Sequence, residues 1–232
     1  MAGSSFAVEQ THETGRKSFN GLARQYSAPV VGRIFGSCCG PAGISGSALA
    51  GAIGAALMVK VARITERKLP PGPERDKVVE LGEKIERLRN VLEDVVDEDA
   101  EAYAKLVRIK SAHARGLESD QALERALKTS TIIPGAMGRA AMICINLAAE
   151  LAEVAYRRAL WDLAMGVWLC NAAVEASLTA AAYNLSEISD DAFRAKLLGK
   201  LDFFDNRSST LDAILSTTRK RGVPTANSVA TP

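Results

Sequence analysis

The stretch Ala159–Leu185, ALWDLAMGVWLCNAAVEASLTAAAYNL, contains only two charged residues, Asp162 and Glu175. Its apolar residues would lie on every side of a helix, which is typical of a helix that is covered all round. We therefore predict a central helix over this stretch. Because so little of its surface is polar, we expect Asp162 to be buried or to lie at a subunit contact.

The sequence on both sides of this stretch is also helical in pattern. Prolines at 70, 71 and 73 stop one helix before the next begins, Ser119 can cap another, and Pro134 fits the first turn of the helix that it would start. No segment of useful length alternates as a strand does. We predict an all-α multi-helix bundle, with helices at about 45–67, 74–115, 119–131, 134–158, 159–185, 189–201 and 209–218.

One helical domain accounts for most of the 232 residues. Residues 1–17 are polar and without pattern, so we expect a disordered N-terminal extension. The helical domain is expected over residues 18–205, including a short helix at 18–25. Residues 206–232 are expected to form a C-terminal helix and a flexible tail.

Composition limits the classes of partner and site. A net charge of +2, with 24% charged residues of mixed sign, gives no reason to expect nucleic acid. The four cysteines and two histidines show no metal-ligand spacing, so we expect no metal. Residues 34–59 are uncharged, but this segment is rich in glycine and contains Pro41, so we expect no membrane span. Without a secretory signal, a cytoplasmic location is expected.

Polar residues interrupt the apolar pattern at three places. Asp99 falls on the buried stripe of residues 74–115, between Val95 and Tyr103, where a carboxylate needs a partner. It is either a structural residue that meets a helix terminus or an arginine, or a functional group. For Asp162, a polar contact between subunits and a functional site remain equally open. The glycine-rich loop 36–47 precedes a helix and could bind an anion or a carbonyl oxygen through its amides.

Six motifs occur here in a characteristic order. A glycine-rich loop, Gly40–Ser45, is followed by LAGAIGAAL at Leu49–Leu57, and DEDAEAY follows at Asp97–Tyr103. Ala126–Pro134 and Leu151–Asp162 come next, and Asn184-Leu185 precedes a short acidic segment ending in a phenylalanine. Together these motifs resemble those of the formiminotetrahydrofolate cyclodeaminase and methenyltetrahydrofolate cyclohydrolase family, and the resemblance covers about residues 18–200.

The resemblance implies an all-helical homodimer of the cyclohydrolase type that binds a tetrahydrofolate derivative near the subunit contact. It implies attack at an amidine-like one-carbon centre, by water in a cyclohydrolase or with expulsion of ammonia in a cyclodeaminase. A carboxylate can stabilise the cationic centre. The residues it points to are Asp162 and Asp99 as catalytic groups and, for the substrate, Pro41, Gly43, Ser45, Lys68, Tyr103, Asn184 and Trp161.

The sequence departs from the family pattern in its two most specific motifs. Ala42 and Ile44 replace glycines of the usual triplet, and Trp161 replaces the serine before Asp162. Bulk at these positions would narrow a folate pocket. Two alternatives therefore stay open: an enzyme of the same fold recruited to a non-folate imine, amidine or cyclisation substrate, and a non-catalytic helical dimer.

Overall fold

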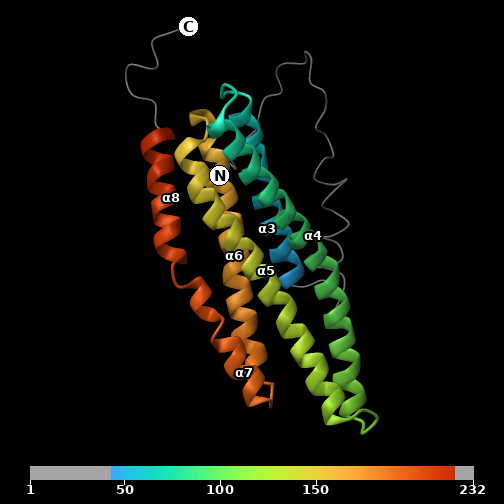
Figure 1. Cartoon of the computed structure of the whole chain (residues 1–232). Coiled ribbons are helices and arrows are strands. Elements are labelled where there is room, and N and C mark those ends of the chain that lie inside the picture. Colours follow the sequence, from blue (N-terminus) through green and yellow to red (C-terminus); the bar gives the residue numbers. More distant parts are fainter. Residues whose placement is uncertain (1–42, 223–232) are drawn as a thin grey trace, which may run out of the picture. The chain divides into compact units, whose positions relative to one another are not determined.

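The computed structural model describes residues 43–222, and the predictions for residues 1–42 and 223–232, Pro41 among them, lie outside this range. The described part is helical and contains no strand, which confirms the all-α prediction. Figure 1 follows it from blue to red. The elements are α3 (Gly43–Glu66), α4 (Pro73–His113), α5 (Asp120–Val154), η1 (Arg157–Ala159), α6 (Leu160–Leu185), α7 (Asp191–Leu198), η2 (Leu201–Phe204) and α8 (Arg207–Gly222).

Four long helices form the core of this unit. Each of α3 and α5 packs against both α4 and α6, and α8 covers α5 and α6. Small residues allow the closest approach: a Cβ on Gly54 would lie 2.6 Å from the carbonyl oxygen of Gly166, and a Cβ on Gly166 would lie 2.6 Å from that of Gly54. Because real Cβ atoms do not come so close, these two glycines set the distance between α3 and α6.

The expected helix boundary at Pro134 is wrong, because α5 continues through this residue. A proline inside a helix removes one N–H donor, so the carbonyl of Ser130, four residues earlier, loses its usual partner. Asn184 of α6 supplies a replacement, since its Nδ2 donates to the Ser130 carbonyl at 3.2 Å. The adjacent helix therefore compensates for the proline, and α5 remains one helix.

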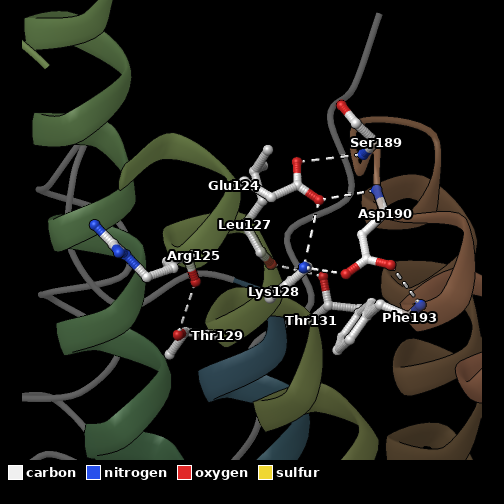
Figure 2. A network of polar contacts seen from close by, with 9 residues as sticks. All are labelled: Glu124, Arg125, Leu127, Lys128, Thr129, Thr131, Ser189, Asp190 and Phe193. Carbon is white, nitrogen blue, oxygen red and sulfur yellow. Dashed lines mark hydrogen bonds and ion pairs between the residues drawn. The ribbon is translucent and has the colours of Figure 1, made fainter. Parts of the chain in front are cut away.

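The turn between α6 and α7 is held by a polar network on α5 (Figure 2). The Glu124 carboxylate accepts hydrogen bonds from the backbone N–H groups of Ser189 and Asp190, at 3.2 and 3.0 Å. Lys128 donates to Asp190 at 2.6 Å, and Asp190 in turn caps α7 by accepting from the Phe193 N–H. The bond from Lys128, with that from Phe193, lowers the pKa of Asp190. The network fixes the C-terminal end of α6.

One face of the bundle is apolar and is not covered by other residues of the described range 43–222. Ile53 of α3 and Trp161, Met165 and Trp168 of α6 are each about half exposed, and we call them the α3–α6 face. Three helical segments, Gly43–Glu66, Asp120–Val154 and Arg157–Leu185, are long and apolar enough to cross a membrane by length and composition alone. About half of each apolar window is buried inside the bundle.

Candidate functional site

A cavity of about 610 Å³ lies where α3 begins and α6 ends. Gly43 and Ile44 of α3, Asp99 and Tyr103 of α4, Pro134 of α5 and the last two turns of α6 line it, and we call it the Asp99 cavity. Four long helices contribute to the wall. The bundle therefore brings together residues that are up to 144 positions apart in the sequence, from Gly43 to Glu187.

Asp99 is the buried carboxylate of this cavity, with 9% of the residue exposed. One of its oxygens, Oδ2, accepts hydrogen bonds from the backbone N–H of Ser45 at 3.1 Å and from the Ser45 hydroxyl at 2.7 Å. Ser45 lies in the first turn of α3, where the helix dipole also favours a negative charge. The sequence therefore located the carboxylate correctly, and Ser45 acts by holding it.

Burial raises the pKa of the Asp99 carboxyl, and the two hydrogen bonds from Ser45 oppose that rise only in part. Within residues 43–222, Asp99 forms no ion pair with a lysine, arginine or histidine. A desolvated carboxylate without a cation attracts a positively charged ligand. The structural alternative proposed from the sequence was a contact with a helix terminus or an arginine. The first of these is formed, since Asp99 accepts hydrogen bonds from Ser45 in the first turn of α3, and no arginine pairs with Asp99 in the described part of the chain.

The rest of the lining combines aliphatic side chains, such as Leu106 and Val107, with polar and aromatic ones. Tyr103 and Tyr183 are both exposed large side chains at the cavity, and Lys110 forms an ion pair with Glu187 beside them. The hydroxyl of Ser130 is buried and has no hydrogen-bond partner among the described atoms. Since the Lys110 and Glu187 charges cancel, the cavity has one net negative charge, that of Asp99.

The other predicted residues lie at the opposite end of the bundle. Asp162 is in the first turn of α6 and accepts a 2.7 Å hydrogen bond from Lys60 of α3. Its side chain is 40% exposed, so the expectation that Asp162 is buried is wrong within this chain; the alternative, a subunit contact, is not tested by a single chain. Asp162 lies at the surface because its partner there is Lys60, an exposed lysine that neutralises the carboxylate.

Trp161 and Lys68 accompany Asp162 and do not reach the Asp99 cavity. Trp161 is half exposed on the α3–α6 face, and the Lys68 ammonium lies over the Tyr156 ring, 5.6 Å from its centroid. At 1.5 Å rise per residue, Asp162 and Thr179, which lines the cavity, are about 25 Å apart along α6. One small substrate cannot contact both ends of a single chain.

Sequence reasoning missed most of the lining, including the polar residues Lys110, Ser130 and Tyr183. Ser130 could have been found, because the carbonyl four positions before a proline inside a helix loses its helical donor and needs another one from a neighbouring element. Lys110 lies eleven residues after Asp99, about three helical turns, on the same side of α4. Asn184 was expected to contact substrate, and its side-chain amide donates a hydrogen bond to the Ser130 carbonyl.

A metal site is not evident in the described part of the chain. Among residues 43–222, no three histidine, cysteine, aspartate or glutamate side chains gather closely enough to hold an ion. The polar groups at the cavity are the Asp99 carboxylate, the Lys110–Glu187 ion pair, the Asn184 amide and hydroxyl groups.

Comparison with known proteins gives a consistent result. The sequence pattern of the family described as Formiminotransferase-cyclodeaminase matches residues 35–202. A methenyltetrahydrofolate cyclohydrolase from Methylorubrum extorquens is 27% identical over 166 residues, which are 70% of this chain and 80% of the relative. The crystal structure of formiminotetrahydrofolate cyclodeaminase from Thermotoga maritima has the same fold, with a TM-score of 0.73 and 22% identity over 86% of this chain and 96% of that one.

Proposed function

Because the chain belongs to the formiminotransferase-cyclodeaminase family, we propose that it is a cyclohydrolase or cyclodeaminase acting on a tetrahydrofolate derivative in the Asp99 cavity. The observation that carries this proposal is the buried carboxylate of Asp99, which has no cationic partner in the described residues. The amidine-like one-carbon centre of such a substrate is cationic or easily protonated. It supplies the positively charged partner that Asp99 lacks among the described residues.

The same geometry serves either reaction. In the cyclohydrolase reaction, water adds to the methenyl carbon and a carbon–nitrogen bond of the bridge then breaks. In the cyclodeaminase reaction, a second folate nitrogen adds to the formimino carbon, which closes the bridge, and ammonia leaves. Both steps begin or end with positive charge on an amidine-like group, so an ionised Asp99 can stabilise the charge and receive a proton. Tyr103 and Tyr183 offer aromatic surface to the folate rings.

A homodimer is also part of this proposal, and the α3–α6 face supports it. Three large apolar residues, Trp161, Met165 and Trp168, follow one another at helical spacing on the first half of α6, all about half exposed. The exposed positions Ala172, Glu175 and Thr179 that follow on the second half are small or polar, and only near the end of the helix does a large exposed residue, Tyr183, return. Two copies of α6 packed antiparallel about a two-fold axis would set the large residues of one against the small residues of the other.

This pairing would also complete the site. With the axis between Trp168 and Ala172, Trp161 of the partner subunit lies opposite Thr179, which lines the Asp99 cavity. Asp162 of the partner subunit is next to it in sequence. The two carboxylates that lie at opposite ends of one chain would then meet across the dimer, and Asp162 would be a second group near the one-carbon centre.

The two alternatives predict different behaviour towards folates. Ile44 lines the Asp99 cavity, so its side chain occupies space that a glycine would leave free. The Ile44 side chain therefore favours the recruited enzyme only if it keeps folate out of the Asp99 cavity. A non-catalytic dimer has no need of a buried carboxylate with a raised pKa. We therefore place the folate enzyme first and the recruited enzyme second.

Turnover by the purified wild-type chain tests the proposal. Hydrolysis of methenyltetrahydrofolate is followed by absorbance, and ammonia release from formiminotetrahydrofolate is followed by a coupled assay. We expect one of the two reactions, with micromolar binding of that substrate in calorimetry, about −8 kcal/mol. Ile44→Gly is the accompanying variant and should bind more tightly. If wild type neither turns over nor binds a folate but Ile44→Gly binds one, the result supports the recruited enzyme instead. If neither protein binds a folate, the proposal is overturned.

A further inference from the structure

A second cavity lies between α5, α6 and the α7–η2 segment, and it shares no lining residue with the Asp99 cavity. Its volume is about 240 Å³. Apolar side chains form most of its wall, among them Ile132, Leu178, Leu197 and the two adjacent rings of Phe203 and Phe204, which meet edge to face at 5.3 Å. A largely apolar hollow of this kind favours an apolar group.

The charges at this cavity have one sign. Arg139 of α5 and Lys200, after α7, are the two charged residues of its lining, and no aspartate or glutamate lines it. The Arg139 guanidinium lies over the Phe203 ring, 4.8 Å from the centroid. Within residues 43–222 neither cation has a carboxylate within ion-pair distance, whereas many lysines and arginines of the bundle do.

Two cations beside an apolar space are complementary to a molecule with an apolar body and an anionic end. We propose that this cavity binds an apolar monocarboxylate, with its hydrocarbon part between α5, α6 and the phenylalanine rings and its carboxylate at Arg139 and Lys200. A guanidinium offers two parallel N–H donors to a carboxylate, and the lysine adds a second positive charge. The site is separate from the proposed folate chemistry and does not depend on it.

Binding of octanoate to the full-length protein tests this, with octan-1-ol as the uncharged ligand of the same chain length. We expect calorimetry to detect octanoate and to show octan-1-ol binding at least about tenfold more weakly, because a charge-assisted pair is lost. Arg139→Gln combined with Lys200→Gln should weaken octanoate by about tenfold or more and leave octan-1-ol unchanged. Lys196→Gln removes a positive charge from α7 outside the cavity lining and should change neither.

A filling variant tests the apolar part. Gly135 lines the cavity and a Cβ there meets no atom within 4 Å, so Gly135→Leu can enter the space without disturbing the helix. It should abolish binding of both ligands while circular dichroism remains that of wild type. The proposal is overturned if wild type does not bind octanoate, or if octan-1-ol and the double glutamine variant bind as wild type binds octanoate. If Gly135→Leu does not fold, the charge variants decide alone.

Discussion

Each end of the bundle has a carboxylate at a position where the helix pattern favours apolar residues, but the surroundings of these two carboxylates differ. Asp99 is 9% exposed, held by two hydrogen bonds from Ser45, and has no cation beside it in the described chain. Asp162 is 40% exposed and its charge is neutralised by Lys60. A charged residue in an apolar pattern therefore marks a place worth examining. The neighbouring helix decides whether such a carboxylate is buried without a cation or paired with one at the surface of a single chain.

The largest effect that separates the two ends is expected from Asp99→Asn. The asparagine keeps the size and can still accept the Ser45 hydrogen bonds, but the negative charge is lost. We expect turnover to fall by about 10²–10⁴-fold, measured at saturating substrate. Asp97→Asn is the matched control, because Asp97 is exposed on the same helix, and it should retain full turnover. Loss of activity in both variants would show a general effect of charge on α4 and contradict the assignment.

The connection between the two ends depends on the α3–α6 contact. In Gly166→Ala the new methyl group would lie 2.6 Å from the Gly54 carbonyl oxygen, so the helices must separate. We expect the free energy of unfolding to fall by about 1–3 kcal/mol, measured by urea unfolding. Gly135→Ala is the control, since its methyl group meets no atom within 4 Å, and alanine is expected to stabilise that helix by about 0.4–1 kcal/mol. Equal stability of the two variants would contradict the close contact.

The raised pKa of Asp99 gives a pH test of the comparison. A folded-state pKa above the unfolded value means that the folded chain binds the proton more tightly. Stability from this group is therefore complete below the unfolded pKa and is lost as the pH rises through the folded pKa. Asp99→Asn should be at least as stable as wild type at pH 7 and should lose that advantage as the pH falls, in urea unfolding at several pH values. An advantage that grows towards low pH would contradict the raised pKa.

The smallest effect is expected at the other end. Lys60→Met removes the partner of Asp162 but leaves a carboxylate that water can solvate. We expect the free energy of unfolding of the chain to change by less than about 1 kcal/mol, as for other exposed ion pairs. Urea unfolding at low and high salt checks this. A loss of several kcal/mol would mean that Asp162 is much less accessible in solution than in one chain, as it would be at a buried subunit contact.

Much of this molecule could be predicted from its sequence, and the failures have physical reasons. The periodicity of α4 placed Asp99 on the buried side because burial on a helix follows a fixed repeat. The same periodicity could not show that Lys60, 102 residues before Asp162, would lie beside it. Pro134 was expected to start a helix. Instead α5 continues through it, because Asn184, 54 residues after Ser130, supplies the donor that the Ser130 carbonyl lacks. Lys110 and Tyr183 line the cavity only because α4 and α6 approach there.

The central claim is that Asp99 of one subunit and Asp162 of the other form one site, and mixed dimers test it most directly. Asp99→Asn and Asp162→Asn are each expected to be inactive as homodimers. Produced together, half of the dimers would contain one chain of each kind, and one of the two sites in such a dimer has both carboxylates. We predict recovery of about a quarter of wild-type turnover, as two-fold symmetry requires. No recovery in dimers shown to be mixed, or an active Asp162→Asn homodimer, would contradict the account.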